Sequence, residues 1–219
     1  MSHPSDDMLR IIERHFAQTA DETGCHAPSR TVTQALREVP RDRFVPVTRR
    51  GEAWDDTPLP IGHGQTISQP FIVALMTELL DPQPGQRVLE VGSGCGYQVA
   101  VLSRIVAAVF GIEIVPELAE QAAATLKNLG YHNVEIRAGD GHAGWPGQAP
   151  FDGILVTAAG SGVPAALREQ LRVGGRLVLP VEAPGGLQQD LVVVERQGIN
   201  DFSERKVLGV RFVPLRGYD

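Results

Sequence analysis

The chain has 219 residues, a length that suits one large α/β domain and is short for two. With 42% hydrophobic and 21% charged residues, its composition is typical of a soluble globular protein. A net charge of −6 and a pI of about 5.5 argue against a nucleic-acid-binding protein, which usually carries a basic surface. No apolar run approaches the ~18 residues of a membrane span, and Cys25 and Cys95 suit neither a disulfide framework nor a metal site.

Two helices are expected in the first 40 residues. Ser5 is suited to cap the first helix, because the acidic Asp6 and Asp7 then fall in its first turn. Its expected buried stripe is Met8, Ile11, Ile12 and Phe16. Ser29 precedes a second helix, which Pro40 should end. The acidic start is unlike the basic and then apolar leader of a secreted protein, so we expect a cytoplasmic chain.

Residues 41–69 show neither a helical nor a strand period. Prolines and glycines interrupt the second half of this segment, at Pro58, Pro60, Gly62 and Gly64. We therefore expect irregular backbone, a long loop that is ordered or flexible. A helix should follow from Pro70, because a proline lacks the N–H that has no partner in a first turn. Its expected face is Ile72, Leu75, Met76 and Leu79.

The most informative stretch is 87–98. Its apolar beginning predicts a short strand, and glycines at alternate positions, Gly92, Gly94 and Gly96, predict a tight turn before a helix. A strand, a glycine turn and a helix in that order open a doubly wound sheet and let a nucleotide-like ligand approach bare backbone. A glycine turn that binds nothing is the alternative, since such turns are common.

The glycine spacing selects among ligands. A dinucleotide fingerprint needs a glycine where Tyr97 stands, and a phosphate-binding loop needs a Gly-Lys-Ser or Gly-Lys-Thr ending that is absent. The remaining pattern, acidic-x-Gly-x-Gly-x-Gly from Glu90, resembles the motif of S-adenosylmethionine-dependent methyltransferases. Their ligand carries a cationic sulfonium and an amino group, which suit an acidic residue at a strand end. Ser93, inside the turn, is expected to border the same ligand.

Acidic residues recur at the ends of the next two expected strands. Glu113 lies about 20 residues past the glycines, where a carboxylate can accept hydrogen bonds from ribose hydroxyls. Asp140, followed by Gly141, comes after the third strand and is placed to accept from an adenine amino group. Each alone is an ordinary solvated carboxylate, but their recurrence favours a shared site.

The second half of the chain continues the alternation of strands and helices. Strands are expected at 109–114, 133–138, 151–157, 174–181, 191–195 and 206–214, and helices at 116–129 and 164–171. No crossover helix separates the last strands, so they should be antiparallel additions at the sheet edge. We expect one Rossmann-like α/β domain over 1–219: a doubly wound, mostly parallel sheet with antiparallel C-terminal strands and N-terminal helices. Residues 1–84 hold those helices and the substrate loop, and 85–219 the core.

Several motifs together point to a narrower family. They are the whole loop from Pro58 to Pro70, Val39-Pro40-Arg41, Phe44-Val45-Pro46, Gly139-Asp140-Gly141 and Val210-Arg211-Phe212-Val213-Pro214-Leu215. With them the chain resembles the protein-L-isoaspartate O-methyltransferase family over nearly its whole length, from around Val32 to Leu215. Cys95 stands where that family more often has serine, but its neighbours match.

The resemblance implies a class I methyltransferase. Such an enzyme moves a methyl group from S-adenosyl-L-methionine to the free α-carboxylate of an L-isoaspartyl residue in a damaged protein or peptide, leaving S-adenosyl-L-homocysteine. The ester then closes to a succinimide, and hydrolysis returns part of the material to normal aspartate. D-aspartyl sites are a secondary substrate. We expect a monomer with no metal and with neither a nucleic acid nor a membrane as partner.

The resemblance also assigns residues. Ser68 is implied as the catalytic residue, its hydroxyl donating to the substrate carboxylate; the alternative is a helix N-cap, because Pro70 follows closely. Gln65 and Thr66 are expected beside the methyl donor. The expected substrate residues are Pro60, Ile61, Ile67, Ser68 and Val213. Val213 would act through the main chain of an edge strand that pairs with an extended peptide. Loop packing and a purely structural last strand are the alternatives.

Other functions remain open from the residues alone. A small-molecule methyltransferase with the same cofactor domain would have no need of the loop around Ser68. A non-catalytic adenosylmethionine-binding module would keep Glu90, Glu113 and Asp140 without that loop. A nicotinamide oxidoreductase is disfavoured by Tyr97.

Overall fold

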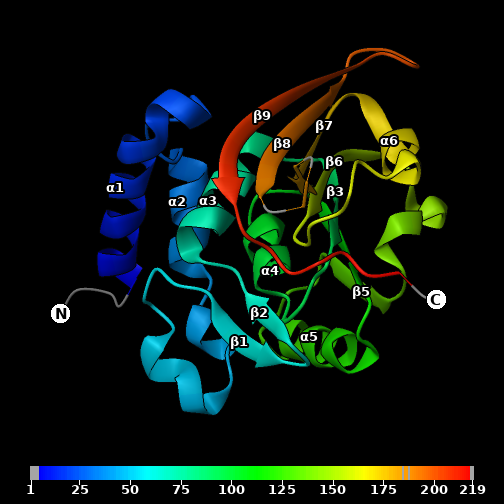
Figure 1. The fold of residues 1–219 in the computed structure, drawn as a ribbon. Coiled ribbons are helices and arrows are strands. Elements are labelled where there is room, and N and C mark those ends of the chain that lie inside the picture. Colours follow the sequence, from blue (N-terminus) through cyan, green and yellow to red (C-terminus); the bar gives the residue numbers. More distant parts are fainter. Residues whose placement is uncertain (1–4, 184, 187, 218–219) are drawn as a thin grey trace.

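The computed structural model describes residues 5–183, 185–186 and 188–217. Its centre is a seven-stranded sheet in the order β5-β4-β3-β6-β7-β8-β9 (Figure 1). The strands are β3 (Arg87–Val91), β4 (Ala108–Glu113), β5 (Val134–Ala138), β6 (Phe151–Val156), β7 (Leu171–Glu182), β8 (Gln189–Arg196) and β9 (Phe202–Val210). Strands β3 to β7 are parallel, whereas β8 and β9 are antiparallel to their neighbours. The expected fold class is confirmed.

Helices pack on both faces of the sheet. They are α1 (Ser5–Thr23), α2 (Arg30–Glu38), α3 (Pro70–Leu80), α4 (Tyr97–Ser103), α5 (Pro116–Asn128) and α6 (Ala165–Gln170). A large apolar core joins α1 to α5 with one face, and a smaller core joins α6 with the other. Figure 1 shows α1 and α2 on one side of the sheet and α6 on the opposite side. Within the described ranges, no helix is long and apolar enough to cross a membrane.

The strand order places a crevice at one edge of the sheet. The chain runs from β3 to β4 and β5 in one direction and returns to β6 on the other side of β3. In a doubly wound sheet, ligands bind outside the carboxyl ends of the strands at such a reversal. The ends of β3 and β6 are also joined, because the Thr157 N–H donates to the Val91 carbonyl at 2.9 Å.

The N-terminal helices differ from expectation in detail. Among the described residues helix α1 runs from Ser5, so this serine lies within the helix and is not its N-cap. Leu9 is buried in place of Ile11, which is only half-buried, because α1 packs against α2, α3 and β9 together. The cap of α2 is confirmed: Ser29 Oγ accepts from the Val32 N–H at 3.3 Å. In α3, Ile72 is also half-buried, whereas the rest of the expected face is buried.

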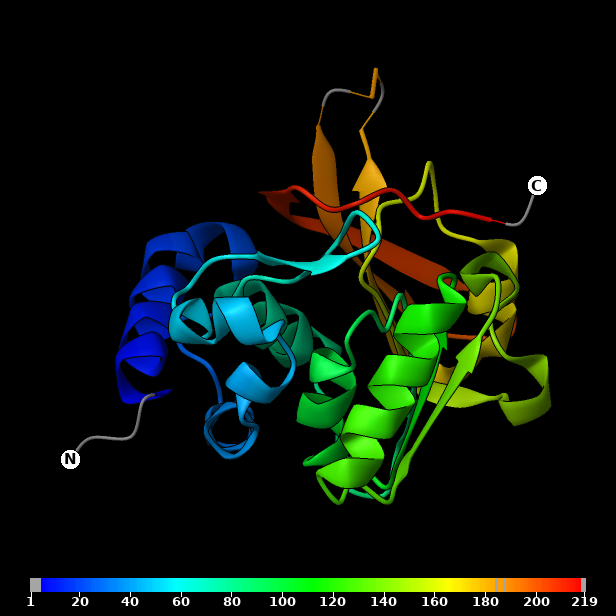
Figure 2. The same cartoon turned by 90° about the horizontal axis from the view of Figure 1, so that it is seen from below.

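The prediction of irregular backbone for residues 41–69 is confirmed for 53–58 and wrong for most of the rest. This segment folds into 3-10 turns, η1 (Arg41–Arg43) and η2 (Val47–Glu52), and a hairpin of β1 (Leu59–Gly62) and β2 (Gln65–Ile67). His63 and Gly64 form its two-residue turn, both with positive φ, as the right-handed twist of a hairpin favours. The strands are too short, and too interrupted by proline and glycine, to show a period. Figure 2 shows the hairpin reaching across towards the end of the sheet.

The last expected strand is wrong in its second half. Strand β9 ends at Val210, because Phe212 exchanges two hydrogen bonds with the Gln189 side chain instead of continuing the ladder. The segment after it crosses the ends of the strands (Figure 2). There Ala159 donates to the Val213 carbonyl at 2.8 Å and accepts from the Leu215 N–H at 2.7 Å. The C-terminal segment is thereby fixed over the crevice.

Candidate active site

A cavity lies outside the carboxyl ends of β3 and β4, between the glycine turn, the hairpin and residues 213–216. It encloses about 730 Å³, its open mouth included. The predicted site residues that line it are Gln65, Thr66, Ile67, Ser68, Glu90, Gly92, Ser93, Gly94, Glu113, Gly141 and Val213. The fold therefore brings residues from both halves of the chain to one cavity, which we call the donor cavity.

Hydrogen bonds fix the glycine turn to the two neighbouring strands. Gly92 has a φ of +89° and donates to the Ile112 carbonyl at 2.8 Å, while its own carbonyl accepts from Thr157 Oγ1 at 2.6 Å. Ser93 Oγ also bonds to the Ile112 carbonyl, at 3.3 Å. The turn is thus tied to β4 on one side and to the end of β6 on the other. Its main chain forms one wall of the donor cavity.

Glu113 has a structural role that the sequence does not indicate. One carboxylate oxygen accepts from the Gly94 N–H at 2.7 Å and the other from the Val115 N–H at 3.0 Å. The side chain is buried, yet it lines the donor cavity. Each carboxylate oxygen has a second acceptor position, so a ribose hydroxyl would still find an acceptor there.

Glu90 is buried without full hydrogen bonding. Its residue is 1% exposed, and Oε2 has no hydrogen-bond partner among the described residues. Burial, followed by repulsion from the Glu113 carboxylate, raises the pKa of Glu90 well above its ordinary value. An unsatisfied buried carboxylate destabilises a fold unless a ligand supplies its partner. Because Glu90 lines the donor cavity, a cationic or hydrogen-bond-donating ligand fits there.

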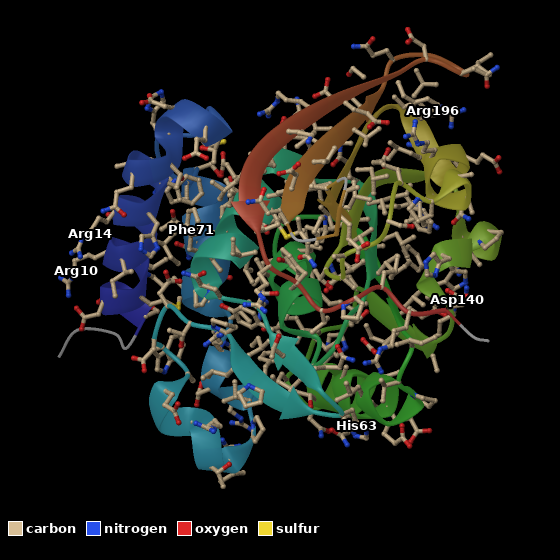
Figure 3. The ribbon with its side chains drawn as sticks, in the orientation of Figure 1. Arg10, Arg14, His63, Phe71, Asp140 and Arg196 are labelled. Carbon is tan, nitrogen blue, oxygen red and sulfur yellow. The ribbon has the colours of Figure 1, made fainter. Side chains whose placement is uncertain are left out.

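A second and wider cavity adjoins the first, and we name it the substrate groove after the acceptor that the sequence leads us to expect. It covers about 2520 Å³, open solvent included, between α1 and the start of α3 on one side and β8, β9 and residues 210–213 on the other. Its walls include the apolar side chains Phe71, Ile72, Leu208 and Phe212. Figure 3 shows Phe71 beside α1, on the side where β9 ends. Thr66, Ser68, Thr157 and Val213 line both cavities.

Ser68 is not the cap of α3. The N-cap position belongs to Gln69, which makes no side-chain cap bond. The free N–H of Phe71 is instead accepted by Asp56 at 2.7 Å, and the same carboxylate accepts from the Gln69 side chain at 2.9 Å. The capping alternative for Ser68 therefore has no support, and the residue lines both cavities.

Some predicted site residues lie outside both cavities. Pro60 is exposed on the hairpin, and Ile61 is buried with its Cδ1 packed towards Gly94. Gly96, with a φ of +86°, packs its Cα against α5 and so serves the contact between helices. Asp140 accepts from the His142 N–H at 2.8 Å and lies 2.9 Å from His142 Nδ1. Figure 3 shows Asp140 near the C-terminal segment and His63 at the tip of the hairpin.

Sequence reasoning missed Thr157, which lines both cavities, and Arg41, which lines neither but bonds to the main chain around the hairpin. Thr157 follows β6 and so stands at the same sheet edge as Glu90 and Glu113, a polar strand end that the search for acidic residues overlooked. Arg41 is fully buried beneath the hairpin, where a charged residue is not expected from a hydrophobic pattern. Cys95 lines the donor cavity, and burial raises the pKa of its thiol to about 12, so it remains a neutral thiol.

Replacing Gly92 by alanine should distort the turn that forms one wall of the donor cavity. The new Cβ would lie 2.8 Å from Thr157 Oγ1, and a positive φ itself costs about 1–2 kcal/mol for an L-residue. We expect a lower Tm and at least ~10-fold weaker binding of S-adenosyl-L-homocysteine by calorimetry. Gly130→Ala is the matched control: its φ is +79° with nothing within 4 Å, so it should lose stability and keep ligand affinity. Equal affinities in the two variants would contradict the assignment of Gly92.

Comparisons with known proteins indicate the family of this chain. The family model of protein-L-isoaspartate(D-aspartate) O-methyltransferase (PCMT) matches residues 15–219. A protein-L-isoaspartate O-methyltransferase of Nitrosococcus oceani is 53% identical over 211 residues, covering 96% of this chain and 95% of the relative. One from Methylorubrum extorquens is 57% identical over 184 residues, covering 84% and 79%.

Solved structures show the same fold. A protein-L-isoaspartate O-methyltransferase superposes with a TM-score of 0.83 at 27% identity, covering 97% of this chain and 66% of that one. A Plasmodium falciparum protein assigned to the same enzyme class, in complex with S-adenosyl-L-homocysteine, gives a TM-score of 0.80 at 24% identity with both chains fully covered. On the family match and the identity of its relatives, the chain belongs to the protein-L-isoaspartate(D-aspartate) O-methyltransferase family.

Proposed function

We propose that the chain binds S-adenosyl-L-methionine in the donor cavity and methylates the α-carboxylate of L-isoaspartyl residues presented in the substrate groove. The observation that carries this arrangement is the junction of the two cavities at Thr66, Ser68, Thr157 and Val213. A groove with a long open side admits a segment of polypeptide, whereas a small-molecule methyltransferase needs only a closed pocket. The small-molecule alternative is also not favoured by the relatives, which share the isoaspartate methyltransferase name.

The donor cavity fits the proposed ligand. When bound, S-adenosyl-L-methionine supplies a methyl group on a cationic sulfonium, a leaving group that needs no further activation. Glu90 supplies the carboxylate that lacks a partner, and Glu113 offers its remaining acceptor positions to the ribose. The bare backbone of Gly92, Ser93 and Gly94 permits close approach. Gln65 and Thr66 close the cavity from the hairpin.

The acceptor side needs little catalytic equipment. A carboxylate with a pKa near ~4 is already ionised at neutral pH, so no general base is required, and the step as proposed needs no metal. Ser68 Oγ donates to this carboxylate and orients it towards the donor cavity. Orientation alone can account for about 7–11 kcal/mol of a barrier. Apolar side chains line part of the groove, and Val213, whose carbonyl already accepts from the Ala159 N–H, borders the peptide.

Other predicted residues are proposed to act indirectly. Ile67 closes the donor cavity, and Ile61 supports the glycine turn from beneath the hairpin. Gly141 borders the cavity, while Asp140 shapes the turn that presents it. We further propose a monomeric, cytoplasmic enzyme that folds as one domain. Contacts of α1 with β9 and of α3 with β6 and β7 support the single domain.

The proposed activity is tested by labelled methyl transfer to two peptides that differ only in an L-isoaspartyl or a normal aspartyl residue. We expect base-labile label on the isoaspartyl peptide and background on its twin. Label on both peptides would deny isoaspartyl selectivity. Label on neither, with S-adenosyl-L-homocysteine bound in calorimetry, would favour a different acceptor, such as a small molecule.

A further inference from the structure

Arg41 is a buried cation that the proposed reaction does not yet use. It is 0% exposed, and burial lowers the pKa of its guanidinium, which still stays charged. Among the described residues no carboxylate pairs with it at salt-bridge distance. A buried charge without an ion pair is expensive unless fixed dipoles solvate it. The groups that surround the guanidinium therefore indicate the role of Arg41.

Three main-chain carbonyls surround the guanidinium. Nη1 donates to the Ala53 carbonyl, and Nη2 donates to the carbonyls of Thr57 and Ser68, both at 3.1 Å. These carbonyls lie at the end of η2, just before β1 and just after β2. Arg41 therefore links the segments before and after the hairpin, and the Ser68 carbonyl is the most C-terminal of its three acceptors.

The same side chain also contacts the donor side. Its Cζ lies 5.7 Å from the centroid of the Tyr97 ring, within the range of a cation–π interaction. Tyr97 is the first residue of α4, directly after the glycine turn, and it lines the donor cavity. The guanidinium thus lies between the helix that follows the donor turn and the residue that borders the acceptor.

We propose that Arg41 is a positioning residue for methyl transfer, which fixes the Ser68 main chain, and through it the Ser68 hydroxyl, relative to the donor cavity. The inference rests on the proposed function of Ser68. Only a planar fork with several donors can reach all three carbonyls at once; a lysine ammonium is a compact charge on a flexible stem. A small displacement of Ser68 reduces the transfer rate, because reacting groups must meet at the correct distance and angle.

The test compares Arg41→Lys with Arg43→Lys. Arg43 lies on the same 3-10 turn but is exposed, so its substitution repeats the chemical change without the buried contacts. The readout is the single-turnover rate of methyl transfer to the isoaspartyl peptide. The rate is divided by the concentration of sites that bind S-adenosyl-L-homocysteine, so that unfolded protein does not lower the measured value. We expect at least a 10-fold slower transfer in Arg41→Lys, with donor affinity and peptide KM within about threefold of the wild type. Arg43→Lys should match the wild type throughout.

Chemical rescue separates positioning from stability. Millimolar guanidinium should restore part of the transfer rate per site in Arg41→Ala, because the added cation can bond to the same carbonyls. It should not alter Arg43→Ala. A wild-type transfer rate per site in Arg41→Lys, even with a lower Tm, would overturn the inference and reduce Arg41 to a stabilising residue. An inactive wild type would instead count against the proposed function, so the two failures are distinguishable.

Discussion

A Ser68→Ala enzyme is expected to bind S-adenosyl-L-homocysteine with wild-type affinity and to transfer methyl groups about 100-fold more slowly, the loss that follows when a reacting group is misplaced by ~1 Å. Ser68 lies where the two cavities meet, and its hydroxyl is not used to cap α3. Removing the hydroxyl therefore removes an orienting donor and leaves the fold intact. Steady-state kinetics on an isoaspartyl peptide, with calorimetry and thermal unfolding, measure all three quantities.

Ser29→Ala is the control, and it should lower stability without changing turnover. Ser29 caps α2 by accepting from the Val32 N–H, and it lines neither cavity. Its loss should lower stability by about 1 kcal/mol and leave turnover unchanged. If Ser68→Ala instead behaved like Ser29→Ala, less stable and fully active, Ser68 would be a structural residue and the catalytic assignment would fail.

Glu90→Gln should separate ligand affinity from stability. The substitution removes the negative charge that faces the donor cavity, so S-adenosyl-L-methionine should bind roughly 10- to 100-fold more weakly, the usual worth of a hydrogen bond to a charged group. The unliganded variant should nevertheless have a higher Tm than the wild type. A neutral amide is less costly to bury than a carboxylate whose Oε2 has no hydrogen-bond partner among the described residues.

The pH dependence of this effect has a definite sign. The folded-state pKa of Glu90 lies above its unfolded value, so its contribution to stability is fully present below the unfolded pKa. That contribution is lost as pH rises through the raised folded pKa. The Tm difference between Glu90→Gln and the wild type should therefore be small near pH ~4 and grow towards neutral pH. Thermal unfolding across this range, without ligand, measures it.

Glu113→Gln is the matched comparison for Glu90→Gln. Both oxygens of the Glu113 carboxylate accept backbone N–H groups, from Gly94 and Val115. An amide retains only one acceptor oxygen, so one of these N–H groups would lose its partner at a cost of ~1–3 kcal/mol. Glu113→Gln should thus lower the Tm at neutral pH. A lower Tm in Glu90→Gln as well would show that the Glu90 carboxylate is satisfied in the folded chain.

The sequence predicted the core of the fold because its signals are local and repeated. Apolar strands that end in glycine or an acidic residue recur from β3 to β5, and the absence of a crossover helix indicated antiparallel β8 and β9. The hairpin was missed because β1 and β2 are only four and three residues long and include Pro60 and Gly62. The end of β9 was misplaced because a side chain, Gln189, competes there for the main chain.

Site residues could be predicted where they lie at the end of a strand. They could not be predicted where tertiary contacts determine the position of the residue. Glu90 and Glu113 line the donor cavity as the alternation of strands and turns implied. Gly96 shares the glycine motif, but its place is set by packing against α5, which no local pattern reveals. Arg41 acts through carbonyls that are 12, 16 and 27 residues away in sequence. Such a contact becomes visible only when the chain is folded.

In the proposed enzyme the methyl donor and the isoaspartyl carboxylate meet at Ser68. A crystal structure of the chain with S-adenosyl-L-homocysteine and an isoaspartyl peptide tests it most directly. We expect the thioether sulfur in the donor cavity and a peptide carboxylate oxygen within ~3 Å of Ser68 Oγ, facing the sulfur across the width of one methyl group. A peptide carboxylate bound elsewhere in the groove, or a ligand outside the cavity that Glu90 borders, would contradict this account.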